Sequence, residues 1–303
     1  METLQTLQKR IDTTGKMQSI VKSMKTLSAV NIRQYERAAV SLEKYQRTIT
    51  LGLQVALGQY SLPARGTAPF TAGRSVVAFG SDQGLCGRFN EKLAQFIIQS
   101  VREWDRKEKI HFLVIGARLA VRLEASGFPA EEQFWVPGSV GGINFNVYQV
   151  LQTLEKWRTE HHISHIDIFF NGHAAGTAGT PCRQSLAPIV DSLLGDMVSQ
   201  PWAGPSLPQF SIPVEELFSG LIRQYLFVTL FRAQAESLAS EQASRLRSLQ
   251  NAEKNIDERL GELRGLFSAQ RQATITAELL DIVTGFRTSG RRKKDELIMI
   301  MDR

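Results

Sequence analysis

The sequence predicts an α/β insert between two long helices that pair with each other as an antiparallel coiled coil. Three observations predict this fold class. Narrow stripes of apolar residues at helical spacing run along both ends of the 303-residue chain. Between them, strand-like apolar runs alternate with helical patterns, which is typical of an α/β sheet. Stretches rich in proline, glycine and serine separate the middle of the chain from its two ends.

The first segment, residues 1–59, is predicted to be one continuous helix, since no proline occurs before Pro63. Its apolar residues lie three and four positions apart, which places them on one helix face. They are Leu4, Leu7, Ile11, Met17, Ile20, Met24, Leu27, Leu42, Tyr45, Ile49 and Leu53. The stripe is as narrow as a coiled-coil seam, so this helix needs a helical partner.

The last segment, residues 213–290, carries the same pattern. Its apolar residues include Leu217, Leu221, Tyr225, Val228, Leu246, Leu249, Ile256, Leu260, Leu263 and Phe267. A helix from Val214 to Phe286 would be about 110 Å long, which is too long to be buried in one globule. Residues 291–303 are expected to form a separate basic and apolar tail, whose basic run is typical of a solvated surface.

The middle, residues 70–200, is predicted to be a small parallel α/β (Rossmann-like) domain. The expected strands are residues 75–80, 110–115 and 165–170, and the expected helices are residues 90–104, 119–125 and 147–159. The stretches 60–73 and 202–213 read as connectors.

The two long helices differ in length, and this predicts an overhang. If pairing begins at the inserted domain, about 55 residues of each helix pair over roughly 80 Å. The last helix then extends alone beyond about residue 270. Its unpaired part still carries Ile275, Leu279, Leu280, Ile282, Val283 and Phe286. Because a lone helix does not stably expose so much apolar surface, we expect other chains to enclose it.

Composition excludes several classes. The two cysteines make no disulfide framework, and no apolar run approaches the roughly 18 residues of a membrane span. The N-terminal sequence lacks the apolar region of a secretory signal. The net charge is +6, and residues 1–57 hold nine Lys/Arg against four Asp/Glu. Such a basic segment suits an acidic protein partner, anionic lipid or nucleic acid.

The loop "GSDQGLCGRFN" at residues 80–90 resembles a phosphate cradle in composition only. Its glycines, at 80, 84 and 87, fit neither the dinucleotide-binding spacing nor a P-loop. Asp82 would also repel a phosphate at the start of the following helix. We therefore interpret the loop as a strand-to-helix turn in which glycine permits tight packing.

No other motif predicts chemistry. His161, His162 and His165 have no evident fourth ligand, so a solvated helix end is the favoured interpretation. Hydrolase, zinc-protease and EF-hand patterns are absent from the sequence. We expect no catalytic residue, no metal site and no cofactor.

Several stretches together resemble the γ subunit of F-type ATP synthases. "SDQGLCGRFN" at 81–90 is similar to the family's S-D-x-G-L-C-G-x-[LF]-N pattern, and "KSMK" at 22–25 to its K-A-M-K. "LASEQASRL" at 238–246 and "RQATITAEL" at 271–279 resemble L-A-S-E-Q-A-A-R-M and R-Q-A-x-I-T-x-E-L. The stretches follow the family's order and span most of the chain. The extension beyond residue 285 departs from the family and suggests a diverged variant, for which a sodium-translocating type is one hypothesis.

The resemblance implies a non-catalytic rotor shaft inside a ring of α and β subunits, resting on an ε subunit and a membrane ring of c subunits. The shaft would couple ion-driven rotation to the catalytic sites on the β subunits, on the cytoplasmic face of the inner membrane, as a peripheral protein. The family's contacts with a β-subunit loop carry over to Arg271, Gln272, Thr276 and Glu278. The resemblance also implies that Met24 and Lys25 lie near them.

Two other classes stay open at this point. A nucleotide-binding α/β enzyme with coiled-coil arms would bind nucleotide through residues 70–200 alone. A coiled-coil nucleic-acid binder would suit the isoelectric point near 9.4. However, the basic helices lack the interleaved aromatic residues of a stacking platform, and we expect no nucleic-acid partner.

Overall fold

The computed structural model describes residues 3–59, 73–104, 109–172, 179–188, 206 and 208–301, with side chains of the last helix described through Thr284. The chain divides into two compact units. One unit is Lys25–Ser248, and the other combines the residues up to Met24 with those from Leu249 onward. Each unit contains part of both long helices.

The unit Lys25–Ser248 is built on a five-stranded sheet with the order β3-β2-β1-β4-β5. The strands are β1 (Gly73–Phe79), β2 (Ile110–Ile115), β3 (Glu132–Phe134), β4 (Ile163–Gly172) and β5 (Thr180–Ala187). The first four are mutually parallel, whereas β5 pairs with β4 in the antiparallel direction. The three predicted strands are confirmed. The prediction of a parallel sheet is wrong at one edge: β5 is antiparallel, so the sheet is mixed, and this strand was not predicted.

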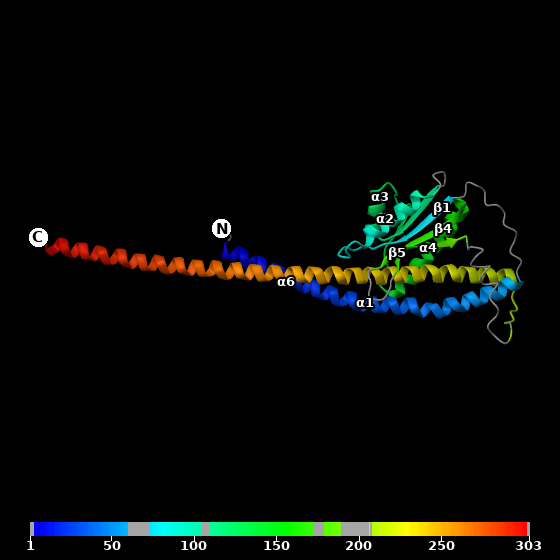
Figure 1. The fold of residues 1–303 in the computed structure, drawn as a ribbon, viewed down its shortest axis with the longest axis horizontal. Helices are drawn as coiled ribbons and strands as arrows, with labels where there is room; N and C mark the ends of the chain where they lie inside the picture. The colour runs from blue at the N-terminus through cyan, green and yellow to red at the C-terminus, as the bar shows by residue number, and fades with distance from the viewer. Residues whose placement is uncertain are drawn as a thin grey trace. The chain divides into compact units, whose positions relative to one another are not determined.

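Helices cover both faces of this sheet (Figure 1). They are α2 (Phe89–Arg102), α3 (Ala117–Glu124) and α4 (Val140–Glu160). The helices α2 and α3 pack on one face, around a cluster that includes Leu93, Ile97 and Leu119. The opposite face is covered by α4 and by the last helix, α6 (Val214–Met301).

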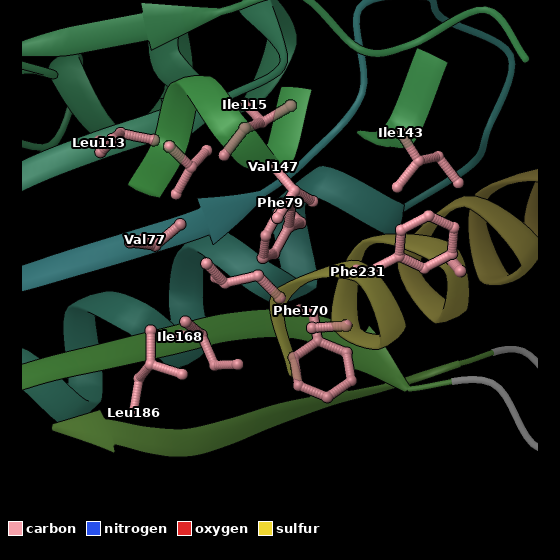
Figure 2. Close-up of a cluster of buried hydrophobic side chains, with 14 of the residues drawn as sticks. Val77, Phe79, Leu113, Ile115, Ile143, Val147, Ile168, Phe170, Leu186 and Phe231 are labelled. Carbon is pink, nitrogen blue, oxygen red and sulfur yellow. The ribbon is translucent and has the colours of Figure 1, made fainter. Parts of the chain in front are cut away.

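Alternate residues of the strands point into this second interface. Figure 2 shows Val77 and Phe79 of β1 gathered with Leu113, Ile115 and Ile168 against side chains of α4 and α6. All five are at most 1% exposed. Phe231 of α6 belongs to the same cluster, so the last helix is part of the core of the domain and not an appendage to it.

The first helix, α1 (Leu4–Gln59), pairs with α6 within the same unit, as predicted. Ile49, Leu53 and Leu57 pack against Tyr225 and Val228. The pairing is antiparallel, since residue numbers rise along α1 as they fall along α6. Gln46 lies within 3.5 Å of Arg232, and Gly52 lies beside Leu221.

In the second unit, residues 4–24 of α1 lie along α6 from Leu249 onward. Leu7, Leu249, Leu260 and Leu263 are buried there. Between Leu263 and Thr284 no side chain of α6 is buried.

The predicted overhang is therefore confirmed. Its apolar side chains are 46–60% exposed, and they are Ile275, Leu279, Leu280, Ile282 and Val283. The helical backbone continues to Met301, so the residues expected to form a separate tail extend the helix instead.

Candidate functional site

The glycine loop that follows β1 is held by its own side chains. The carboxylate of Asp82 accepts hydrogen bonds of 2.8 Å from the backbone N–H of Ala117 and from that of Val136. Ala117 is the first residue of α3, where a bound phosphate would be placed by the helix N-terminus. Asp82 thus places its own carboxylate at the N-terminus of α3 and links the loop to that helix.

Two glycines allow the loop to pack closely. A Cβ atom on Gly80 would lie 2.3 Å from the Cβ of Leu119, and one on Gly116 would lie 2.6 Å from the backbone nitrogen of Ser81. Gly116 also has a φ of +109°, which disfavours other residues. The buried Asn90 side chain completes the loop, accepting from the Ser81 N–H and donating to the Ser81 hydroxyl. The loop is a turn between β1 and α2, as predicted, but of its three glycines only Gly80 makes a close approach; Gly84 and Gly87 do not.

The stretch 238–246 lies where α6 crosses the sheet, and most of it is buried. Two polar contacts from residues just before this stretch attach the helix to the domain. The Ser237 hydroxyl donates to the carbonyl of Phe79 at 2.9 Å, and the Gln234 amide donates to Asn146 at 2.6 Å. The first bond ties α6 to the end of β1 and the second ties it to α4.

A buried ion pair lies at the same crossing. Arg245 donates to the Glu241 carboxylate at 2.6 Å, and each side chain is only 6% exposed. Burial raises the pKa of the Glu241 carboxyl, and the opposing charge of Arg245 limits this increase. Burial likewise raises the pKa of Tyr35 on α1, and the Glu241 charge adds to this shift. The pair therefore lies within α6, and burying its two charges is costly.

The contact residues predicted from the resemblance fall into two groups. Arg271, Gln272, Thr276 and Glu278 are exposed on α6, where the helix extends beyond its partner. The Thr276 hydroxyl donates to the carbonyl of Gln272 within the helix, at 2.8 Å. Met24 and Lys25 are half-buried on α1.

The expectation that Met24 lies near Arg271 is wrong. The Gln18 side-chain amide donates to Asp257, which sets the register of the two helices in this unit. From that contact, Met24 lies about 9 Å along α1 in one direction, and Arg271 lies about 21 Å along α6 in the other. About 30 Å of helix axis therefore separates them. Within this unit, Met24 and Arg271 are therefore distinct positions along the two helices.

The histidine run does not form a site by itself, but one member contacts residues that the sequence did not indicate. His161 stacks on His111 of β2, with ring centroids 4.4 Å apart, and its Nε2 lies 3.7 Å from Glu131. His165 instead hydrogen-bonds the Ser164 hydroxyl at 2.8 Å. The expectation that no further ligand lies nearby is therefore wrong for His161. No sequence pattern joins His111 and Glu131 to it.

No helix in the described ranges combines the length and the apolar character that a bilayer span requires.

The comparisons with known proteins agree with this architecture. A family model described as ATP synthase matches residues 3–288. The ATP synthase gamma chain of Anaeromyxobacter sp. (strain Fw109-5) is 27% identical, and the alignment covers 94% of this chain and 98% of that one. The gamma chain of Anaeromyxobacter dehalogenans (strain 2CP-C) is 25% identical, with 94% and 99% covered.

Among solved structures, a chain of the Euglena gracilis mitochondrial ATP synthase, in a structure of OSCP, F1 and c-ring, aligns with a TM-score of 0.64 at 16% identity. The alignment covers 96% of each chain and shows the same fold. Because the family model matches nearly the whole length, from the first helix through the overhang, this chain belongs to the ATP synthase gamma chain family.

Proposed function

We propose that this chain is the central rotor shaft of an F-type ATP synthase, which couples ion-driven rotation in the membrane to nucleotide affinity at catalytic sites on other subunits. The observation that carries the proposal is the overhang of α6, where large apolar side chains stay about half exposed over several turns. A surface of this kind needs a surrounding sleeve. A ring of α and β subunits would supply it.

The shaft acts through differential contacts and not through bond chemistry. A contact shifts a catalytic site between open and closed states only by the difference in its free energy with the two states. A shaft with one overhanging helix and one shorter partner is asymmetric, so each of the surrounding β subunits meets a different surface. Rotation moves each surface from one β subunit to the next, and nucleotide affinity changes in sequence.

The α/β domain is the part of the chain that would receive the torque and pass it to α6. The hydrogen bonds from Ser237 and Gln234 attach α6 to β1 and to α4, so a torque applied to the domain reaches the helix. We infer that the domain rests on the c-ring and an ε subunit, with the protein held peripherally at the cytoplasmic face of the membrane. The similar chain from Euglena belongs to an assembly that includes both F1 and a c-ring, which supports this placement by analogy.

The basic character of the first helix suits acidic loops on the surrounding ring. In the unit that contains the overhang, Lys9 and Arg10 of α1 and Arg259 of α6 line one groove. Exposed ion pairs contribute only about 0–1 kcal/mol each. Many weak contacts hold a shaft in place while allowing it to turn.

Arg271 and Gln272 test the β-subunit contact. In the assembled complex, the double variant Arg271→Ala, Gln272→Ala is expected to lower ATP-driven ion pumping by roughly twofold to fivefold, the loss of about 1 kcal/mol of exposed contacts. Nucleotide binding to the catalytic subunits should be retained, because neither residue belongs to those subunits. Pumping and ATP hydrolysis are measured together on membrane vesicles.

The matched control is Arg122→Ala with Gln99→Ala, which removes the same two residue types from exposed helix positions of the α/β domain. This variant should pump as the unchanged complex does. Equal pumping by both double variants and the parent would contradict the assignment of Arg271 and Gln272.

A further inference from the structure

We propose that His111, Glu131 and His161 form a binding site for a first-row divalent metal ion, with zinc as the best-suited ion. The site lies at the amino end of the parallel strands, away from the glycine loop at their carboxyl end. Each residue offers one ligand atom, and these atoms all lie within 4.8 Å of one another. The site is independent of the rotor function and of the contacts along the helices.

The backbone holds all three residues in a firm frame. His111 is the second residue of β2 and is 1% exposed, with its ring against Trp157 of α4. Glu131 precedes β3, and its N–H donates to the carbonyl of Phe112 at 2.8 Å. His161 ends α4, and its N–H donates to the carbonyl of Trp157 at 2.8 Å. Two strands and one helix therefore bring the ligands together.

The Glu131 carboxylate lies beside the two stacked imidazoles, with one oxygen toward each ring. One oxygen is 2.5 Å from Nδ1 of His111, and the other is 3.7 Å from Nε2 of His161. The two rings are nearly parallel, with an interplanar angle of 16°. Without a metal, this arrangement is a hydrogen-bonded carboxylate beside two stacked rings.

A bound metal requires the side chains of His161 and Glu131 to move, while His111 can stay in place. Tetrahedral zinc with bonds of about 2.0–2.2 Å separates its ligand atoms by roughly 3.3 Å. Because a metal lies in the plane of each imidazole that binds it, the His161 ring must turn out of its stack on His111. His161 and Glu131 are 30% and 42% exposed, so both side chains have room to move while the buried His111 stays in place.

The donor set selects the class of metal. Two imidazoles and one carboxylate suit zinc and its first-row neighbours, whereas calcium and magnesium prefer oxygen ligands alone. Water can complete the coordination, since the site is open on the side of Glu131 and His161. A metal on Nδ1 of His111 leaves Nε2 as a donor. The paired residue on β1 is Ser75, whose buried hydroxyl has no hydrogen-bond partner among the described residues.

The test is isothermal titration of the full chain with zinc, together with the visible absorption of bound cobalt as a probe of tetrahedral geometry. The unchanged chain is expected to bind one equivalent. His161→Ala and Glu131→Gln are each expected to weaken binding at least about tenfold. The matched control is His165→Ala, which removes a histidine of the same run that lies outside the trio. It should bind as the unchanged chain does.

Circular dichroism of each variant checks that the fold is intact, which the exposure of Glu131 and His161 leads us to expect. Two results would overturn the proposal. One is a folded chain that takes up no zinc, which would leave Glu131 as a hydrogen-bond partner of His111 and nothing more. The other is equal affinity in His161→Ala, Glu131→Gln and the unchanged chain, which would place any bound metal elsewhere.

Discussion

Replacing Arg245 by alanine is expected to lower the free energy of unfolding of the chain by about 3–5 kcal/mol. Arg245 forms an ion pair with Glu241, and both side chains are buried where α6 crosses the domain. Removing the guanidinium leaves a buried carboxylate without its counter-charge, and that is the costly state. The measurement is urea unfolding, followed by far-ultraviolet circular dichroism.

The sign of the pH dependence follows from the Glu241 carboxyl. Burial already raises its pKa above the ordinary value of 4.5, and loss of Arg245 removes the interaction that lowers it. The folded variant therefore binds the proton more tightly than the unfolded variant does. Its stability should fall as the pH rises from about 4.5 through the raised pKa, and the decline should be steeper than in the unchanged chain.

Two comparison variants separate the ion pair from a general effect of helix substitution. Arg247→Ala changes an exposed arginine two residues away on the same helix and should shift the stability by no more than about 0.5 kcal/mol. The double variant Glu241→Met, Arg245→Met removes both charges and should recover most of the loss. A folded Arg245→Ala chain as stable as the parent would show that the pair contributes nothing at this crossing.

Replacing Gly116 by alanine is expected to destabilise the chain by about 2–5 kcal/mol, through overpacking and backbone strain together. The added Cβ would meet backbone atoms of Gly80 and Ser81 at 2.6–2.7 Å, and backbone cannot move aside as a flexible side chain can. The positive φ adds a conformational cost. The same urea unfolding measurement applies.

Gly127 offers a matched control, because it also has a positive φ but has open space around it. Gly127→Ala should lower the free energy of unfolding only by the cost of the positive φ, roughly 1–2 kcal/mol. The difference between the two variants isolates the close approach of the glycine loop to α3. Equal losses in both would mean that backbone strain alone explains the requirement for glycine, and that the loop is not held by tight packing.

The sequence was sufficient to predict the long helices and the central strands, because each depends on a regular apolar pattern. The stripe of α1 and the continuous apolar run of β2 are local signals. The two edge strands gave no such signal. β3 has only three residues, and most of β5 is polar or exposed, so neither shows the alternation that identifies a strand.

Contacts between segments that lie far apart in the chain could not be predicted from the sequence. His111, Glu131 and His161 are brought together by the parallel pairing of β2 with β3 and by the return of α4 to the sheet. The separation of Met24 from Arg271 depends on the register of the two helices, which a single contact such as Gln18 with Asp257 fixes. Similar motifs identify positions in a family, but they do not give the distance between those positions.

The central claim is that the overhanging part of α6 is covered only when other subunits enclose it. Amide hydrogen exchange of residues 270–284 tests this most directly, with residues 249–263 of the same helix as the internal comparison. In the purified chain, residues 270–284 should exchange much faster than residues 249–263, which are paired with α1. In the complex with α and β subunits, both stretches should be protected. Strong protection of residues 270–284 in the purified, monomeric chain would contradict the account.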